Sequence, residues 1–275
     1  MQRKPVVLTL TSIPPRFANL PRKFKSLEKQ SQKPDFVELN IPKAYRRFPG
    51  ELPILPTLPD WVSVKFCEID YGPASKVLPT VRRWRNKEAD LLVCDDDRLP
   101  DRHWIERIAK TRAERPDDII TERGWNINER FGNIRADLDL PRALQDKKGG
   151  RTIAYRFKRT LSLGTLHPPR KLFQHSGYID VFEGFLGALL PSAALPPAAF
   201  DIPEIIWTVD DIWLSGMAYH NGVKVWAHNT PRPVFSDGYY DKLSSLRDFT
   251  HVEYNRERAD RYAVDYLRNT YGIWP

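Results

Sequence analysis

Residues 91–97, Leu-Leu-Val-Cys-Asp-Asp-Asp, join an apolar run directly to three consecutive carboxylates. A short, continuous apolar run is typical of a strand that is buried on both faces of a parallel sheet. Three adjacent carboxylates repel one another, and a hard divalent cation such as Mn²⁺ or Mg²⁺ relieves that repulsion. The stretch therefore predicts a buried strand that ends in a metal-and-diphosphate site, and a solvated acidic turn is the alternative.

Strand-like and helix-like segments alternate on the N-terminal side of this stretch and just beyond it. Repeated strand-helix order predicts a mostly parallel sheet flanked by helices, which is an α/β fold. In such sheets ligands bind at the carboxyl ends of the strands, where the three aspartates fall. Strands are predicted at residues 6–10, 36–41, 62–66 and 91–94, and helices at residues 20–27, after 72–73 and at about 100–115.

The C-terminal part of the chain is less regular. Residues 178–190 form a long apolar segment with Gly184 and Gly187, which predicts a strand pressed closely against another backbone or a ligand. Residues 126–175 show no clear pattern. A helix is predicted at residues 212–220, a strand at 224–227, and a closing amphipathic helix at 257–271.

The composition fits one globular body. The chain has 275 residues, of which 41% are hydrophobic and 12% aromatic, so it is long enough to bury a large core. Only Cys67 and Cys94 occur, both in apolar runs, which favours a reducing compartment such as the cytoplasm. We expect two halves of a single domain, residues 1–115 and residues 116–275.

The net charge of +8 favours anionic partners such as nucleotides, acidic glycans or membrane headgroups. Basic residues occur no more densely than pairs such as Arg46-Arg47 and Lys147-Lys148. A nucleic-acid partner is therefore not indicated. The apolar run near the N-terminus is too short for a signal sequence or a membrane span, so the chain as given is expected to be soluble, with an anchor outside it left open.

Three segments of the first half resemble the donor side of GT-A glycosyltransferases. The triplet Asp95, Asp96 and Asp97 resembles the DxD motif that holds a metal against the donor diphosphate. Residues 8–16 resemble the first strand and nucleotide-binding loop, and residues 70–76 resemble a stretch near the base. The resemblance implies metal ligation by Asp97 and Asp95, and donor binding by these residues: Thr9, Arg16, Asp70, Lys76, Asp95 and Asp96.

Two segments of the second half resemble the acceptor side of the same class. Residues 183–191 resemble the segment before the catalytic acid, and residues 209–216 resemble the motif whose second acid is the base in inverting members. Asp211 would then be the base, with Asp210 where Glu is more common. Each Asp would be ionised at neutral pH. The alternative is that Thr208 and Asp211 form a helix capping pair.

Two further residues are candidates by position. His228 follows a strand-like segment, and the resemblance implies that it joins Asp97 as a metal ligand; an ordinary core or surface histidine is the alternative. Trp125 lies in a loop, where its ring would stack on an acceptor sugar. Such rings are more often part of the core.

Taken together, the resemblance implies a GT-A type Rossmann-like fold with an acceptor-side second half. The activity would be a sugar transfer, hexosyl or related, from a UDP- or GDP-sugar to a glycan or lipid-linked glycan in bacterial polysaccharide biosynthesis. The protein would be cytoplasmic, with peripheral association at the inner face of a membrane left open. A metal-dependent phosphohydrolase or nucleotidyltransferase, or a carbohydrate-binding module without catalysis, would also explain the composition.

Overall fold

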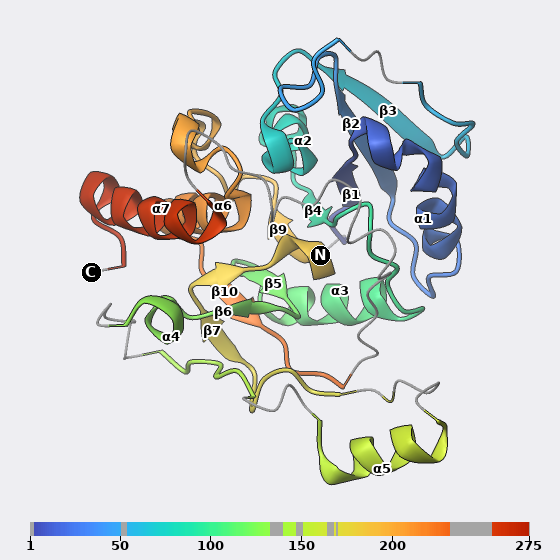
Figure 1. Cartoon of the computed structure of the whole chain (residues 1–275), viewed down its shortest axis with the longest axis vertical. Coiled ribbons are helices and arrows are strands. Elements are labelled where there is room, and N and C mark those ends of the chain that lie inside the picture. The colour runs from blue at the N-terminus through green and yellow to red at the C-terminus, as the bar shows by residue number, and fades with distance from the viewer. Residues whose placement is uncertain are drawn as a thin grey trace.

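A computed structural model describes residues 3–50, 54–132, 140–146, 151–163, 168, 170–231 and 255–274. Its centre is one eight-stranded sheet to which both halves of the chain contribute (Figure 1). In order across the sheet, the strands are β3 (Val62–Cys67), β2 (Phe36–Pro42), β1 (Val6–Thr11), β4 (Asp90–Val93), β9 (Ala188–Pro191), β5 (Ile119–Thr121), β10 (Val225–Ala227) and β7 (Gly177–Ile179).

The four strands β3, β2, β1 and β4 run parallel to one another, as the alternating pattern predicts. Strand β9 comes from the second half of the chain and lies antiparallel between β4 and β5. Strand β10 is parallel to β5, and β7 closes the edge antiparallel to β10. A separate two-stranded sheet pairs β6 (Gly124–Trp125) with β8 (Val181–Phe182). The predicted α/β class with a mostly parallel sheet is confirmed.

Helices cover both faces of the main sheet (Figure 1). One face packs against α1 and α3, and the opposite face packs against α2, α6 and α7. The bounds of the helices are α1 (Leu20–Leu27), α2 (Leu78–Trp84), α3 (Trp104–Glu114), α4 (Ile127–Phe131), α5 (Ile153–Leu161), α6 (Asp210–His220) and α7 (Arg256–Tyr271). Short 3₁₀ segments are η1 (Pro14–Asn19), η2 (Gly72–Lys76), η3 (Gly184–Leu186), η4 (Pro197–Phe200) and η5 (Glu204–Ile206).

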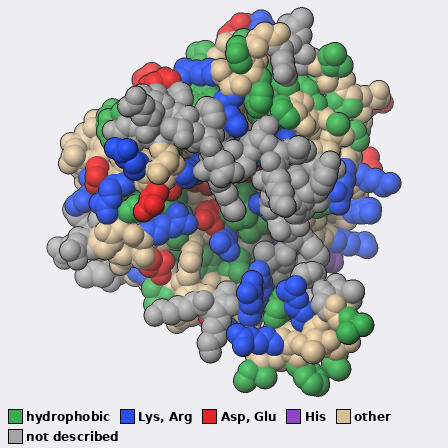
Figure 2. All heavy atoms as spheres, in the orientation of Figure 1, with side chains coloured by type: hydrophobic (Ala, Val, Ile, Leu, Met, Phe, Trp, Pro, Cys, Tyr) green, Lys and Arg blue, Asp and Glu red, His purple; other side chains and the backbone are tan. Residues whose placement is uncertain are grey.

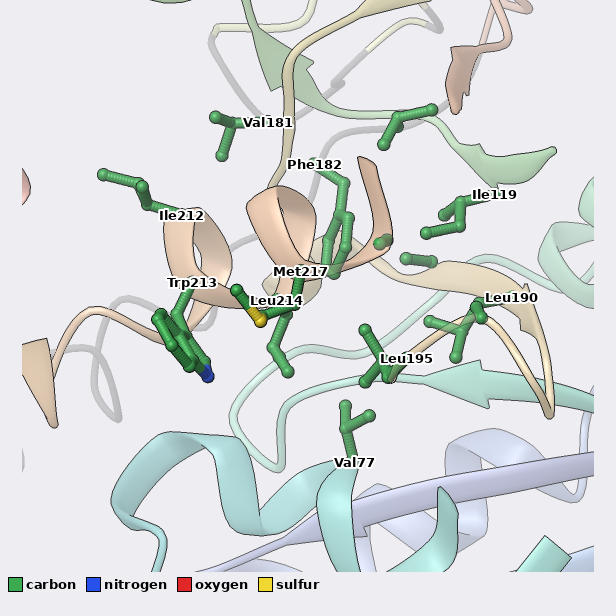
Figure 3. Close-up of a cluster of buried hydrophobic side chains, with 14 of the residues drawn as sticks. Val77, Ile119, Val181, Phe182, Leu190, Leu195, Ile212, Trp213, Leu214 and Met217 are labelled. Carbon is green, nitrogen blue, oxygen red and sulfur yellow. The ribbon is translucent and has the colours of Figure 1, made fainter. Parts of the chain in front are cut away.

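The two-sided cover explains why the strands read as continuous apolar runs. Side chains alternate across a strand, so Leu91 and Val93 of β4 join the core under α2 and α6, whereas Leu92 joins the core under α1 and α3. Figure 3 shows the first of these cores, in which Trp213 and Met217 of α6 are buried together with residues of the sheet such as Leu190.

The single strand expected at residues 178–190 is wrong. The segment is divided into β7, β8, η3 and β9, and η3 is separated from β9 at Gly187, whose φ of +99° a strand does not allow. A Cβ on Gly187 would lie 2.3 Å from the Trp104 ring, so the close approach predicted for these glycines is present, against a side chain of α3. Within the described part of the chain, no helix is long and apolar enough to cross a bilayer.

Candidate active site

A pocket of about 400 Å³ lies at the carboxyl ends of the four parallel strands β1 to β4. Its walls combine residues that follow those strands with residues from the start of α6. Side chains that the sequence singled out for separate motifs meet in this one pocket, namely Arg16, Asp70, Lys76, Asp95, Asp96, Asp97, Asp210 and Asp211. The pocket therefore joins the two halves of the chain.

Lys76 lies at the junction between the two groups of carboxylates. Its Nζ is 2.8 Å from Asp95 Oδ1 and 2.8 Å from Asp210 Oδ2, and it is 3.9 Å from Asp211 Oδ1. Only 4% of Lys76 is exposed, and the attraction of these carboxylates raises its pKa even though burial alone would lower it. Lys76 is thus a fixed positive charge that holds Asp95 of the first half beside the Asp210-Asp211 pair of the second.

The three aspartates after β4 are not equivalent. Asp96 accepts hydrogen bonds from Ser12 and Arg16, and Asp95 pairs with Lys76. Burial would raise the pKa of Asp95, but the attraction of Lys76 outweighs it, so that this pKa is lowered. Asp97 Oδ1 accepts no hydrogen bond from the described residues, although Arg98 Nε lies 3.6 Å away. Burial and the adjacent charges of Asp95 and Asp96 raise the pKa of Asp97 to about 6.

Asp211 is held at the start of α6, where the backbone N–H of Gly184 donates a hydrogen bond of 3.1 Å to its Oδ1. Burial first, and then the negative charges of Asp210 and Asp95, raise the pKa of Asp211 to about 8. The expectation that both acids of this pair are ionised at neutral pH is therefore wrong for Asp211. The capping alternative is also wrong, because the N-cap residue of α6 is Val209 and no side chain caps the helix.

The raised pKa predicts a specific dependence of stability on pH. An unfolded Asp loses its proton near pH 3.8, whereas folded Asp211 keeps it until about pH 8. The native state binds more protons between these values, so stability should fall as the pH rises toward 8, by roughly 1 kcal/mol per pH unit. Asp211→Asn should remove this part of the slope. Urea unfolding of both proteins from pH 7 to pH 8 measures it, above the titration of Asp97 near pH 6; parallel slopes would refute the assignment.

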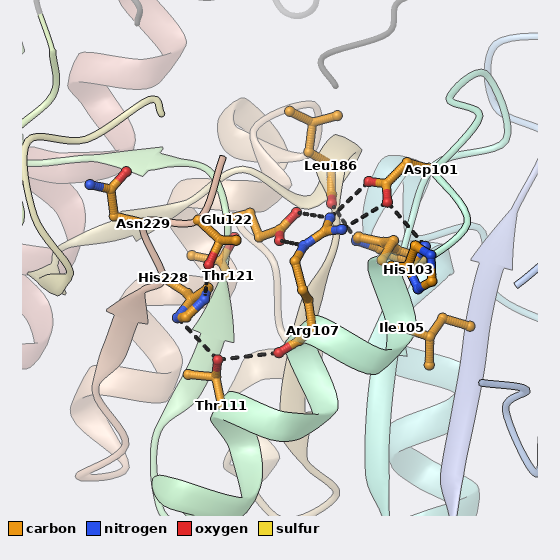
Figure 4. Close-up of polar contacts among 12 residues, drawn as sticks. Asp101, His103, Ile105, Arg107, Thr111, Thr121, Glu122, Leu186, His228 and Asn229 are labelled. Carbon is orange, nitrogen blue, oxygen red and sulfur yellow. Dashed lines mark hydrogen bonds and ion pairs between the residues drawn. The ribbon is translucent and has the colours of Figure 1, made fainter. Parts of the chain in front are cut away.

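His228 is not at the aspartate triplet but lies beside Thr111 of α3 (Figure 4). It follows β10, which is three strands away from β4, or roughly 14 Å at the usual strand spacing. Its Nδ1 lies 3.1 Å from Thr111 Oγ1, its Nε2 contacts Thr230, and burial lowers its pKa. In the ranges that the structure describes, no three His, Cys, Asp or Glu side chains form a metal site. The expected pairing of His228 with Asp97 is corrected accordingly.

Thr9 and Trp125 also lie outside the pocket lining. Thr9 is fully buried in β1, and its hydroxyl donates a 2.5 Å hydrogen bond to the Lys76 carbonyl oxygen. Thr9 therefore holds the backbone at Lys76 in position. It does not line the pocket, so the expected contact between Thr9 and a nucleotide is wrong. Trp125 is 3% exposed and packs edge-on against Phe131. The Arg130 guanidinium lies over the Trp125 ring, 4.0 Å from its centre. The sugar-stacking role expected for Trp125 is wrong, because its faces are covered.

Sequence reasoning weighed Trp207 only as one of three tryptophans that could stack on a sugar, and it missed much of the rest of the pocket wall. Trp207 lines it and rests on Gly72, where a Cβ would come within 2.8 Å of the indole. Its Nε1 donates to the Asp70 carbonyl oxygen at 3.1 Å. One sequence signal could have indicated this wall, namely the basic and aromatic run Tyr-Arg-Arg-Phe at residues 45–48, in the loop between the strands predicted at 36–41 and 62–66. Glu183 and Phe185 of the acceptor-side segment also line the pocket, and the other lining residues that were missed are Tyr45, Arg47, Phe48, Arg98, Arg130, Arg256 and Asp260.

Comparison with known proteins places the chain in no family. No family model matches it, and no curated protein matches it. One solved structure that matches is 4-diphosphocytidyl-2C-methyl-D-erythritol synthase, with 12% identity and a TM-score of 0.44 over 97% of this chain and 99% of that chain. Its name is not that of a glycosyltransferase. A match at this level assigns no activity, so the function has to be argued from the pocket.

Proposed function

We propose that this protein is a glycosyltransferase that moves a sugar from a nucleoside diphosphate-sugar to a glycan or lipid-linked glycan, with a divalent metal at the donor diphosphate. The observation that supports it best is the meeting of two acidic groups in one pocket. The Asp95–Asp97 group follows β4 and the Asp210-Asp211 pair opens α6. The first group suits a metal and diphosphate, and the second suits proton transfer at the acceptor.

Asp97 and Asp95 would hold the metal, Mn²⁺ or Mg²⁺. The fit is supported by Asp97 Oδ1, which accepts no hydrogen bond from the described residues, whereas Oδ2 pairs with Arg16 at 3.1 Å. The raised pKa of Asp97, due first to burial and then to Asp95 and Asp96, is also consistent with a place for a cation. When bound, such an ion stabilises the negative charge of a departing diphosphate. Asp96 is already engaged by Ser12 and Arg16, so it would act by holding Arg16 at the donor.

The remaining roles fall to charged side chains of the pocket. Arg16 and Lys76 would offset diphosphate charge, and Asp70, fixed by the backbone N–H groups of Arg46 and Gly72, would face the nucleoside. The Asp211 carboxylate would take the proton of the acceptor hydroxyl as its oxygen bonds to the anomeric carbon and the bond to the diphosphate breaks. Because its pKa is about 8, only the ionised minority of Asp211 could accept this proton at neutral pH, but in that form it is a stronger base than an ordinary Asp. One displacement gives inversion.

Calorimetric titration with UDP and with GDP, with and without Mn²⁺, tests the donor site. We expect metal-dependent binding of one nucleotide, and Asp97→Ala should weaken it more than about tenfold, because a metal ligand is lost. The exposed Glu88, just before β4, provides the control: Glu88→Ala should bind as the wild type does. Equal binding by Asp97→Ala and the wild type would contradict the proposed metal role.

Nucleotidyl transfer is a second candidate, because a metal held by the same carboxylates at a diphosphate suits either reaction. The two differ in their products. A glycosyltransferase incubated with a nucleotide-sugar and acceptor releases a nucleoside diphosphate, whereas a nucleotidyltransferase incubated with a nucleoside triphosphate releases pyrophosphate. Pyrophosphate release without any use of a nucleotide-sugar would replace the first proposal with the second.

A further inference from the structure

The positive charge of the chain is concentrated in one region once acidic residues are counted as well. Residues 147–171 contain eight Lys and Arg and no Asp or Glu. The net charge of the whole chain is +8, so the remaining residues are balanced overall. The basic pairs that look scattered along the sequence therefore leave one segment that carries the excess charge, and α5 lies within it.

Helix α5 extends from the body of the molecule (Figure 1) and carries an exposed apolar stripe. Ile153, Phe157 and Leu161 follow one another at intervals of four residues, which places them on one side of the helix. They are 88%, 64% and 71% exposed, and Leu163 just beyond the helix is 93% exposed. We call these four residues the α5 stripe. Large apolar side chains exposed together mark an interaction surface.

The opposite side of α5 faces the protein. Tyr155 is the only buried side chain of residues 151–163 within the described structure. The guanidinium of Arg170 lies 5.8 Å from the centre of its ring, and Arg159 donates a 3.4 Å hydrogen bond to its hydroxyl. Tyr155 thus fixes the orientation of the helix and leaves the α5 stripe directed outward.

Basic side chains border the α5 stripe. Arg156 and Lys158 are exposed next to it on the helix, Arg151 is exposed just before the helix, and Arg159 is exposed on the side of Tyr155. Figure 2 shows blue side chains between the body and the green tip of this projection. Burial lowers the pKa of the nearby Arg170, and the positive charges of Arg151 and Arg159 lower it further. Positive charge is therefore concentrated at the helix that carries the α5 stripe.

We propose that α5 is a membrane-surface helix that inserts the α5 stripe at the boundary between headgroups and acyl chains of an anionic lipid bilayer. An apolar stripe with Lys and Arg beside it is the pattern that such interfacial helices share. The basic residues would pair with anionic headgroups while the three helical side chains leave water. The inference is independent of the chemistry in the pocket, and it would bring the protein to a lipid-linked substrate.

Charge and shape separate this partner from two others. Nucleic acid would satisfy the basic residues but would leave the α5 stripe exposed to water. A second copy of the chain would cover the stripe but would bring two strongly basic surfaces together, which is unfavourable. An anionic bilayer satisfies both features of α5.

Flotation with vesicles tests the proposal. We compare vesicles of phosphatidylcholine alone with vesicles that contain about one third phosphatidylglycerol, at low and high salt. The wild-type protein should float with the anionic vesicles and be released by salt. Ile153→Ser/Phe157→Ser/Leu161→Ser and Arg156→Gln/Lys158→Gln/Arg159→Gln should each lower the partition coefficient, the latter by on the order of 100-fold.

Matched variants on α1 and the following turn provide the control. Arg22→Gln/Lys25→Gln/Lys29→Gln removes the same charge from exposed positions and should leave flotation within about twofold of the wild type. Equal loss from both charge variants would overturn the proposal, as would unchanged flotation of the stripe variant or no flotation of the wild type. A wild-type dimer that the stripe variant converts to a monomer would assign the stripe to self-association instead. Unchanged thermal unfolding of each variant confirms that it is folded.

Discussion

Asp211→Asn is expected to lower kcat by about 10²- to 10⁴-fold, the usual contribution of a general base, while it leaves binding of the donor nucleotide unchanged. The amide keeps the shape of the side chain, and its oxygen can still accept the hydrogen bond from the Gly184 N–H. It cannot, however, take up the proton of an acceptor hydroxyl. Turnover assays with saturating nucleotide-sugar measure kcat, and calorimetry with the nucleoside diphosphate measures donor binding.

A matched variant separates chemistry from a change in surface charge. Asp201 is exposed and lies on the approach to α6, so Asp201→Asn should keep the kcat of the wild-type protein. Wild-type kcat in Asp211→Asn would remove the proposed role of base. Loss of donor binding together with turnover would show that Asp211 supports the pocket rather than the reaction.

Lys76→Met is expected to lower the free energy of unfolding at neutral pH by about 3 kcal/mol or more. The substitution keeps much of the side-chain volume, but it leaves Asp95 and Asp210 buried without the cation that lies 2.8 Å from each of them. The loss should be smaller at acidic pH, because the carboxylates then take up protons. Urea unfolding at neutral and acidic pH measures both effects.

An exposed ion pair provides the comparison. Lys43 pairs with Glu68 on the surface, where both side chains are more than half exposed. Lys43→Met should change the free energy of unfolding by less than about 1 kcal/mol. If Lys76→Met were no more destabilising than Lys43→Met, the ion-pair cluster would not hold the two halves of the pocket together.

The sequence was sufficient to predict the first half of the fold. Continuous apolar runs gave the parallel strands at nearly their observed positions, since burial on both faces leaves little room for polar residues. The position of the aspartate triplet after β4 followed from the same pattern. Gly272 ends α7 in the left-handed conformation with a φ of +64°, as its place after an amphipathic helix predicts.

Long-range pairing could not be predicted in the same way. Nothing in residues 188–191 indicates that they pair antiparallel between β4 and β5, because an apolar run carries no information about its neighbours. The raised pKa of Asp211 could not be predicted either, since it comes first from burial in the folded pocket, then from Asp210, and to a smaller extent from Asp95, more than a hundred residues away in the chain. His228 was misplaced because proximity to a strand end does not say which strand lies next to it.

The insertion of β9 between β4 and β5 has a consequence for synthesis on the ribosome. Strands β1 to β5 are complete once residue 121 has been made, yet β4 and β5 are joined only by residues 188–191. The nascent chain must therefore wait for about seventy further residues, several seconds at typical elongation rates, with the facing edges of β4 and β5 unpaired. Those edges are the surfaces on which a chaperone would act and on which premature aggregation would begin.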